Sequence, residues 1–277
     1  MPNPPKILVF DSGLGGLTVL AEIMRLRPDA ACVYAADDAV FPYGRLGEAE
    51  LISRVDMVMA ALIPLHRPDI VVIACHTAST LVLPGLRALW PELPFVGTVP
   101  AIKPGAEASL SGMVSVLATP GTVQRDYTQA LVRDFASHCA VNLVGASRLA
   151  SLAEQHMQGQ AVDEAAVRDE IAPAFVMQGG RRTDVIVLAC THYPLLLPLF
   201  ETLAPWPVQW IDPAPAIARR ADQVLRDKFG EQGAFAAGLP HPAVFTSGRK
   251  PGALLEKALR LRALNAVEWE LEARLPI

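Results

Sequence analysis

The sequence predicts an α/β protein made of two pseudosymmetric domains, each built around a parallel sheet. Short aliphatic runs alternate with longer amphipathic segments along the chain, an order typical of parallel strands joined by helices. In addition, residues 69–77 (DIVVIACHT) and 184–192 (DVIVLACTH) share an aspartate, four aliphatic residues, an alanine and a cysteine in register. A buried strand explains the aliphatic residues but not a thiol at the same strand end. We therefore interpret the two segments as equivalent parts of two related domains.

Hydrophobic periodicity gives the individual elements. Strands are expected where apolar residues stand together, and helices where they recur every three or four positions. The expected strands are residues 6–10, 31–36, 69–74, 113–118, 140–144 and 184–189. The expected helices are residues 17–26, 48–63, 78–90, 123–135 and 163–177. Proline-rich stretches at 90–104 and 205–215 suggest where the chain crosses between domains, giving a first domain of residues 1–97 plus 208–277 and a second of residues 98–207.

Composition and charge narrow the classes of function. The 277 residues include 24 Lys and Arg against 28 Asp and Glu, a net charge of −4, which argues against a protein that mainly binds nucleic acid. The longest charge-free run, residues 70–86, is shorter than the ~18–20 residues of a membrane span, so no membrane partner is expected. The first apolar run is too short for a signal peptide, and four cysteines without a C-x-x-C pair fit free thiols in a reducing compartment. A cytoplasmic location is expected.

Small polar residues follow four of the expected strands. These segments are residues 10–16 (FDSGLGG), 75–79 (CHTAS), 119–122 (TPGT) and 190–194 (CTHYP). Parallel strands end at one edge of a sheet, where ligands bind, and free N–H groups and hydroxyls there suit a carboxylate. A dinucleotide site is disfavoured because Thr18 stands where the G-x-G-x-x-G pattern needs its last glycine.

Cys75 and Cys190 end the two matching strands beside threonine and histidine. A helix N-terminus or a nearby histidine can bring a thiol into the range of acid/base chemistry. Cys32 and Cys139 lack polar neighbours and are expected to behave as small hydrophobes.

A metal site and a redox pair are two other interpretations of the same strand ends. A metal site built from Cys75, His76, Cys190 and His192 is disfavoured because adjacent residues on an extended segment point to opposite faces. A dithiol redox pair is disfavoured because the two cysteines lack C-x-x-C spacing.

One thiol on each wall of a cleft suggests stereochemical inversion, since neither a G-x-S-x-G motif nor a P-loop is present. One thiolate would remove a proton from a tetrahedral carbon, and the opposite thiol would return one to the other face. Asp11, Glu154 and His192 would manage the protons of the thiols. Asp11 could alternatively serve as a helix cap, and on local sequence alone a solvated helix face is the better interpretation of Glu154.

Six motifs in order resemble the cofactor-independent glutamate racemases of the aspartate/glutamate racemase superfamily, over most of the chain. The motifs are residues 10–18 (FDSGLGGLT), 41–44 (FPYG), 74–79 (ACHTAS), 97–100 (GTVP), 119–122 (TPGT) and 190–195 (CTHYPL). The resemblance implies a two-domain α/β fold with the active site in the cleft between the domains. It also implies interconversion of L- and D-glutamate without metal or pyridoxal phosphate, a role in supplying D-glutamate for cell-wall peptidoglycan and cell shape, and a homodimer.

The resemblance also implies a role for each matching residue. Cys75 and Cys190 match the two acid/base thiols, the first acting on D-glutamate and the second on L-glutamate. Asp11, His192 and, through the loosest motif, Glu154 match the auxiliary catalytic groups. The implied substrate contacts are Asp11, Ser12, Tyr43, Gly44, His76, Thr77, Thr119, Thr122, Thr191 and His192.

His76 departs from the family, which usually has asparagine after the first cysteine. Histidine is bulkier and can carry charge, so it can reshape the pocket, shift the pH optimum or depress activity. We expect racemase activity to be retained.

Three alternatives stay open. A related racemase could act on aspartate or another acidic compound. A binding or regulatory homologue could keep the fold without turnover, although such a protein has no need for two poised thiols. A pyridoxal-phosphate racemase needs a Schiff-base lysine, and none of the five lysines stands in a phosphate-binding context.

Overall fold

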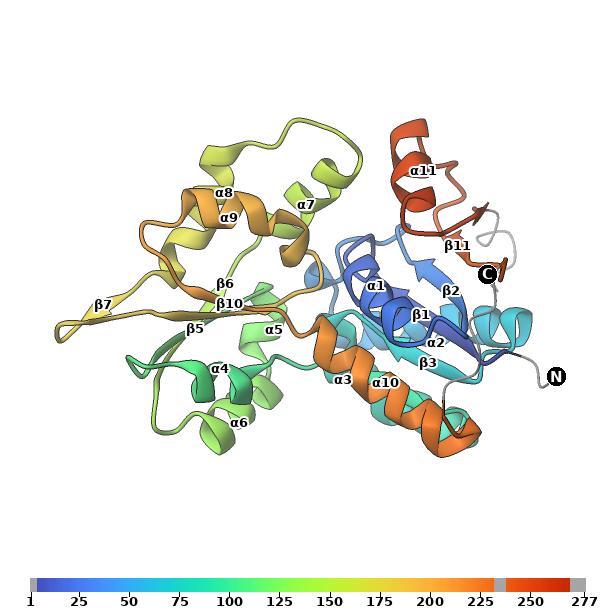
Figure 1. Cartoon of the computed structure of the whole chain (residues 1–277), viewed down its shortest axis with the longest axis horizontal. Helices are drawn as coiled ribbons and strands as arrows, with labels where there is room; N and C mark the ends of the chain where they lie inside the picture. The colour runs from blue at the N-terminus through green and yellow to red at the C-terminus, as the bar shows by residue number, and fades with distance from the viewer. Residues whose placement is uncertain (1–3, 232–237, 270–277) are drawn as a thin grey trace.

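The chain forms two parallel sheets, each inside its own lobe (Figure 1). This computed structural model describes residues 4–231 and 238–269. The strands of the first sheet are β1 (Lys6–Asp11), β2 (Ala31–Ala36), β3 (Ile70–Ile73), β4 (Phe95–Gly97), β11 (Pro242–Phe245) and β12 (Ala266–Glu268). The strands of the second sheet are β5 (Met113–Ala118), β6 (Ala140–Gly145), β9 (Val185–Ala189) and β10 (Gln209–Ile211). A two-stranded antiparallel ribbon of β7 (Met177–Gln178) and β8 (Arg181–Arg182) projects from the second lobe.

The two sheets repeat one topology. The first runs β12-β11-β2-β1-β3-β4 and the second runs β10-β9-β5-β6. Strands β2-β1-β3-β4 therefore correspond to β6-β5-β9-β10, and the cysteine-bearing strands β3 and β9 occupy equivalent places. The predicted α/β class with two parallel sheets is confirmed. The division into domains stays a prediction, and the expected boundary at 207/208 would separate β10 from the sheet in which it pairs with β9.

Helices cover both faces of the first sheet. One face carries α1 (Leu17–Leu26), α10 (Ala214–Phe229) and α11 (Ala253–Arg260), and the other carries α2 (Glu48–His66) and α3 (His76–Leu89). Successive side chains of a strand point to opposite faces. Accordingly, Ile7 and Val9 of β1 pack with α1 and α10, whereas Leu8 and Phe10 pack with α2 and α3. Burial on both sides explains why the strand is continuously apolar.

The second sheet is covered in the same way. Helices α7 (Leu149–Met157), α8 (Glu164–Ile171) and α9 (Leu197–Leu203) pack on one face. Helices α4 (Ile102–Ala108) and α6 (Asp126–Phe135) pack on the other, next to the short α5 (Pro120–Gln124). Short 3₁₀ helices are η1 (Tyr43–Arg45), η2 (Ala172–Ala174) and η3 (Tyr193–Leu196).

Four expected helices differ from the structure at their ends. The helix expected at 48–63 continues to His66. The helix expected at 123–135 is interrupted at Arg125, whose ψ of 136° is extended, so that α5 and α6 are separate. The helix expected at 78–90 begins earlier, at His76, which makes Cys75 its N-cap. The helix expected at 163–177 ends at Ile171 and is followed by η2.

Within residues 4–231 and 238–269, none of the helices combines the length and the apolar character that crossing a bilayer would require.

Candidate active site

The carboxyl ends of equivalent strands meet between the two lobes. A cavity of about 20 Å³ lies there, walled by residues that follow β1, β3, β5 and β9. The predicted site residues that line it are Ser12, Tyr43, Gly44, Cys75, His76, Thr77, Thr119, Cys190, Thr191 and His192. The remaining ones, Asp11, Thr122 and Glu154, lie behind this wall and bond to residues that form it.

Cys75 is linked to a buried carboxylate through a serine. Its Sγ lies 3.8 Å from Oγ of Ser12, and that hydroxyl donates to Oδ1 of Asp11 at 3.2 Å. Burial, together with the charge of Asp11, raises the pKa of the Cys75 thiol to about 12. Cys75 therefore rests as a thiol, with a hydrogen-bonded path from its proton toward Asp11.

Asp11 forms a hydrogen bond between the two lobes. It ends β1 and is fully buried, and its Oδ2 accepts a hydrogen bond of 2.7 Å from the Thr191 hydroxyl of the second lobe. The Gly13 amide donates to Oδ1 at 3.1 Å. Burial raises the pKa of Asp11, although His192 and the bonds from Thr191 and Gly13 oppose the rise.

Cys190 faces a histidine instead of a serine. Its Sγ lies 3.9 Å from Nδ1 of His192, and Nε2 of the same ring lies 2.8 Å from Oε1 of Glu154. Burial alone would lower the pKa of His192, but Cys190 and Glu154 raise it well above its ordinary value. An imidazolium with one N–H on Glu154 and the other toward Cys190 would stabilise a thiolate there.

The glycine loop after β1 holds this pair from the first lobe. The Leu14 amide donates to Oε1 of Glu154 at 2.5 Å, and the Gly15 amide lies 3.2 Å from Nε2 of His192. A Cβ atom at Gly15 would collide with the His192 ring and backbone, and one at Gly13 with the Glu154 carboxylate. The glycines are therefore needed for close approach between the lobes.

Three threonines also join the two lobes, and two of them, Thr77 and Thr119, line the cavity. The Oγ1 atom of Thr77 lies 3.2 Å from that of Thr119 and 3.5 Å from that of Thr122, and the latter two are 3.0 Å apart. Thr119 caps α5 by accepting from the Thr122 amide. Gly44 faces the Thr119 side chain.

Two predicted substrate contacts have unexpected settings. The Tyr43 ring lines the cavity, but its hydroxyl donates to Oδ2 of Asp37 at 2.5 Å. His76 is buried, and neither ring nitrogen makes a hydrogen bond of normal geometry to a described residue. Burial lowers the pKa of His76 to about 3, although the Val99 backbone favours the charged form. The imidazole is therefore neutral near pH 7.

Sequence reasoning missed several supporting groups. Phe41 packs against His192 with the rings tilted by 44° and their centroids 5.3 Å apart, and the Tyr34 hydroxyl donates to the Gly13 carbonyl at 2.5 Å. Phe41 belongs to the FPYG motif, which pointed to this region. Tyr34 stands in an ordinary buried strand, so no local signal marked it. In the ranges that the structure covers, no cluster of three or more His, Cys, Asp or Glu residues is arranged to hold a metal ion.

Known proteins match this chain over most of its length. The model of the Asp/Glu/Hydantoin racemase family matches residues 18–221. A glutamate racemase of Brucella anthropi is 58% identical over 226 residues, covering 82% of this chain and 81% of that protein. A glutamate racemase of Brucella ovis is 52% identical over 264 residues, covering 94% and 92%.

Solved structures agree with these matches. The crystal structure of Escherichia coli glutamate racemase in complex with L-glutamate and the activator UDP-MurNAc-ala has a TM-score of 0.86 and 35% identity, covering 96% of this chain and 97% of that one. Glutamate racemase isoform RacE1 from Bacillus anthracis has a TM-score of 0.76 and 25% identity, covering 97% of both chains. The protein is therefore an amino-acid racemase, an isomerase, and its chain belongs to the Asp/Glu/Hydantoin racemase family.

Proposed function

We propose that the protein is a glutamate racemase that inverts Cα by two-thiol proton transfer. The observation that carries this proposal is that Cys75 and Cys190 line one cavity, at the ends of equivalent strands in opposite lobes. Glutamate as the substrate is supported by the similar glutamate racemases of Brucella and by the E. coli neighbour, whose structure holds L-glutamate.

In the L-to-D direction, Cys190 is the base and Cys75 the acid. The Cys190 thiolate, stabilised by the His192 imidazolium, takes the Cα proton, so that a C–H bond breaks and an S–H bond forms. The Cys75 thiol then delivers its own proton to the opposite face of Cα. The electron pair of the first C–H bond ends in the new one, and the configuration is inverted. The D-to-L direction runs through the same steps with the thiols exchanged.

The negative charge that develops during this exchange needs donors in the cavity. It spreads from Cα into the substrate carboxylate, and the hydroxyls of Thr77, Thr119 and Thr191 stand in or beside the cavity wall. The N-terminus of α3, which starts directly after Cys75, adds a favourable dipole. Such preorganised donors stabilise the carbanionic state more than the bound ground state.

Each turnover leaves the two thiols in exchanged protonation states. After an L-to-D turnover Cys190 is a thiol and Cys75 a thiolate, so the next L-glutamate requires both to be reset. Ser12 and Asp11 provide a proton path on one side, and His192 and Glu154 on the other. The proposed role of the auxiliary residues is therefore to carry protons to and from the two thiols along these hydrogen-bonded paths.

The proposed product, D-glutamate, points to a metabolic role. We propose that D-glutamate serves peptidoglycan synthesis and thereby cell shape. A cytoplasmic location, expected from the short first apolar run and the free cysteines, and a homodimer, implied by the family resemblance, stay predictions.

Isotope exchange tests the proposal. L-Glutamate in deuterated water is incubated with the wild type, Cys75→Ser, Cys190→Ser and the control Cys139→Ser, whose thiol lies outside the cavity. The wild type and the control should yield D-glutamate carrying deuterium at Cα. Each variant of a cavity thiol should lose inversion by ~10³-fold or more, as expected for loss of a general acid or base.

Two outcomes would contradict the proposal. Product without deuterium would exclude exchange through the thiols, and unimpaired inversion by either serine variant would remove that thiol from the reaction. A parallel incubation with L-aspartate separates the substrates, since a higher kcat/KM for aspartate would assign the enzyme to that amino acid instead.

A further inference from the structure

A buried carboxylate that the proposed mechanism does not use lies behind one wall of the catalytic cavity. Asp37 follows β2 and is fully buried. Its amide donates to the carbonyl of Asp11 at 2.8 Å. Its Oδ2 accepts the hydroxyl of Tyr43, whose ring lines the cavity, at 2.5 Å. Asp37 therefore contacts one proposed catalytic residue through its backbone and one wall residue through its side chain.

The Asp37 carboxylate is fixed in place by donors from two distant parts of the chain. Arg54 of α2 donates from Nε to Oδ2 at 2.9 Å and from Nη2 to Oδ1 at 2.6 Å. The Thr246 hydroxyl, which follows β11, donates to Oδ1 at 2.5 Å. Two-pronged pairs of arginine with carboxylate are strong and specific in geometry. These donors therefore also fix the position of the acceptor that Tyr43 uses.

The Tyr43 hydroxyl depends on this acceptor. Tyr43 is buried, and burial together with the charge of Asp37 raises the pKa of Tyr43 well above its ordinary value. The hydroxyl therefore stays protonated and donates. Because an unpaired donor inside the protein is costly, the tyrosine ring has to follow any displacement of the Asp37 carboxylate.

The segment that carries Tyr43 forms a continuous part of the cavity wall. Phe41, Tyr43 and Gly44 all line the cavity. Phe41 also packs against His192, and Gly44 faces the side chain of Thr119. The position of this segment therefore shapes the space that a substrate occupies.

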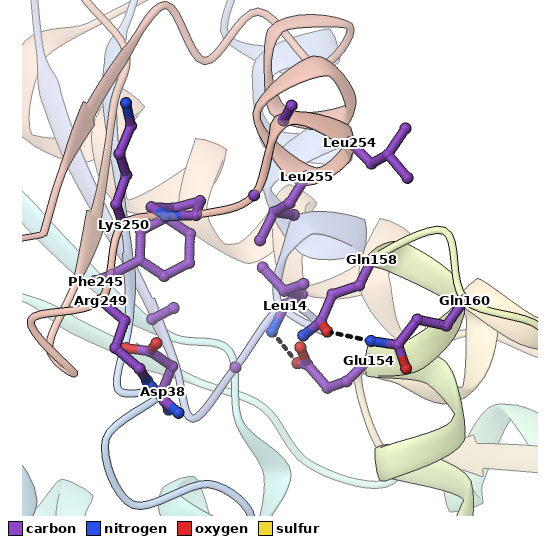
Figure 2. Close-up of a pocket in the computed structure, with 15 residues that line it drawn as sticks. Leu14, Asp38, Glu154, Gln158, Gln160, Phe245, Arg249, Lys250, Leu254 and Leu255 are labelled. Carbon is purple, nitrogen blue, oxygen red and sulfur yellow. Dashed lines mark hydrogen bonds between the residues drawn. The ribbon is translucent and has the colours of Figure 1, made fainter.

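Thr246 and the residue after it bond to different carboxylates. The Thr246 hydroxyl bonds to Asp37, whereas the amide and hydroxyl of Ser247 donate to Asp38 at 2.9 and 2.5 Å. Figure 2, a view of the cavity beside this segment, shows Asp38 on the same side as Phe245. Of the two carboxylates, it is Asp37 that bonds to Tyr43. Adjacent residues of one segment therefore provide a test residue and a matched control.

We propose that Asp37 is a positioning residue for the racemase reaction, through which Thr246 and Arg54 hold the Tyr43 ring in the wall of the substrate cavity. The inference rests on the proposed function, because it takes this cavity as the place where glutamate binds. A displaced wall weakens binding of substrate and transition state alike, which raises KM and spares kcat. The end of β11 is thereby part of the binding machinery.

Three variants and two measurements test the role. Thr246→Val removes the hydroxyl and keeps the shape, Thr246→Ser keeps the hydroxyl, and the control Ser247→Ala removes the hydroxyl that bonds to Asp38. Steady-state kinetics with L-glutamate gives KM and kcat separately. Hydrogen exchange of residues 41–46, without substrate, follows the amides of Arg45 and Leu46, which donate to the carbonyls of residues 42 and 43. This second measurement does not depend on racemase activity.

Thr246→Val should raise KM about tenfold, the value of one hydrogen bond to a charged group, and should keep kcat within about twofold. It should also speed exchange of the Arg45 and Leu46 amides about tenfold, because their local opening becomes easier. Thr246→Ser and Ser247→Ala should resemble the wild type in both measurements.

A double variant tests whether the effect passes through Asp37 to Tyr43. Tyr43→Phe lacks the hydroxyl that Asp37 accepts. In this background Thr246→Val should raise KM by less than about twofold, because residues that act through one network are not additive. Equal effects of Thr246→Val in both backgrounds would contradict the role of Asp37.

Three other results would overturn the inference. The first is unchanged exchange of residues 41–46 in Thr246→Val, whatever the activity. The second is faster exchange with unchanged KM in the active enzyme. The third is an equal change in Ser247→Ala, which would mean that any loosening of this segment has the same effect. A wild type that does not racemise glutamate would instead contradict the proposed function, and hydrogen exchange would still decide whether Thr246 positions Tyr43.

Discussion

The two thiols occupy equivalent strand ends but meet different chemistry. Cys75 has a serine hydroxyl and a buried carboxylate behind it, whereas Cys190 has a histidine supported by a second carboxylate. A negative neighbour favours the thiol, and a positive neighbour favours the thiolate. In the proposed mechanism, Cys75 is therefore the acid and Cys190 the base in the state that accepts L-glutamate.

His76 gives a prediction at the scale of one residue. Its pKa is about 3 in the folded protein and near 6.5 when unfolded, so the unfolded chain binds an extra proton at acid pH. Relative to His76→Asn, the wild type should lose about 1.4 kcal/mol of unfolding free energy per pH unit as pH falls from 6.5 toward 3. Urea unfolding of both proteins at pH 7.5, 5.5 and 4.5 measures this slope.

The same variant tests whether His76 limits turnover. Exchanging one neutral polar group for another should change kcat/KM by less than about tenfold, the value of one hydrogen bond, and should leave the pH–rate profile unchanged above pH 5. If the unfolding free energy falls with pH by the same amount in both proteins, His76 has an ordinary pKa in the folded protein, which contradicts the prediction. A gain in turnover by orders of magnitude would show that histidine cripples the site.

At the scale of the elements, close backbone approach gives the next prediction. Gly15 precedes α1 where a side chain would displace His192, whereas Gly85 in α3 faces open space. Gly15→Ala should lower kcat about 100-fold, because a misplacement near 1 Å costs that much. The control Gly85→Ala should keep wild-type kcat and gain about 0.5–1 kcal/mol of stability. Full activity in Gly15→Ala would mean that the loop and His192 move apart freely.

Local patterns predicted the elements with strong periodicity and failed where contacts are distant. The aliphatic runs gave β1, β2, β3, β5 and β9 within a residue or two, and their ends gave the thiols. The break at Arg125 was missed although Asp126, an acidic residue in the first turn of α6, is a start signal. Glu154 meets His192 across 38 residues of sequence, and local sequence alone favoured a solvated position. The inversion hypothesis and the family resemblance, not the local sequence, pointed to Glu154.

At the scale of the whole molecule, the lobes are held closed by contacts at several points around the cavity. Thr77 bonds to Thr119, Thr191 bonds to Asp11, and Arg125 of the second lobe pairs with Glu48 at the start of α2. The enclosed volume is far smaller than glutamate. Binding must therefore follow an opening step that breaks such contacts, and the rate of that step limits how fast substrate enters.

Stopped-flow tryptophan fluorescence should reveal the opening step. With D-glutamate and a Cys190→Ser background that blocks turnover, the observed binding rate should reach a plateau at the opening rate as ligand concentration rises. Glu48→Gln should raise that plateau by no more than about fivefold, because the Glu48 side chain is 64% exposed and such a pair contributes at most about 1 kcal/mol. The control Glu107→Gln breaks an exposed pair with Lys103 inside α4 and should leave the plateau unchanged. An observed binding rate that rises linearly with ligand concentration and reaches no plateau, with or without the Glu48→Gln substitution, would mean that glutamate reaches the thiols without separation of the lobes.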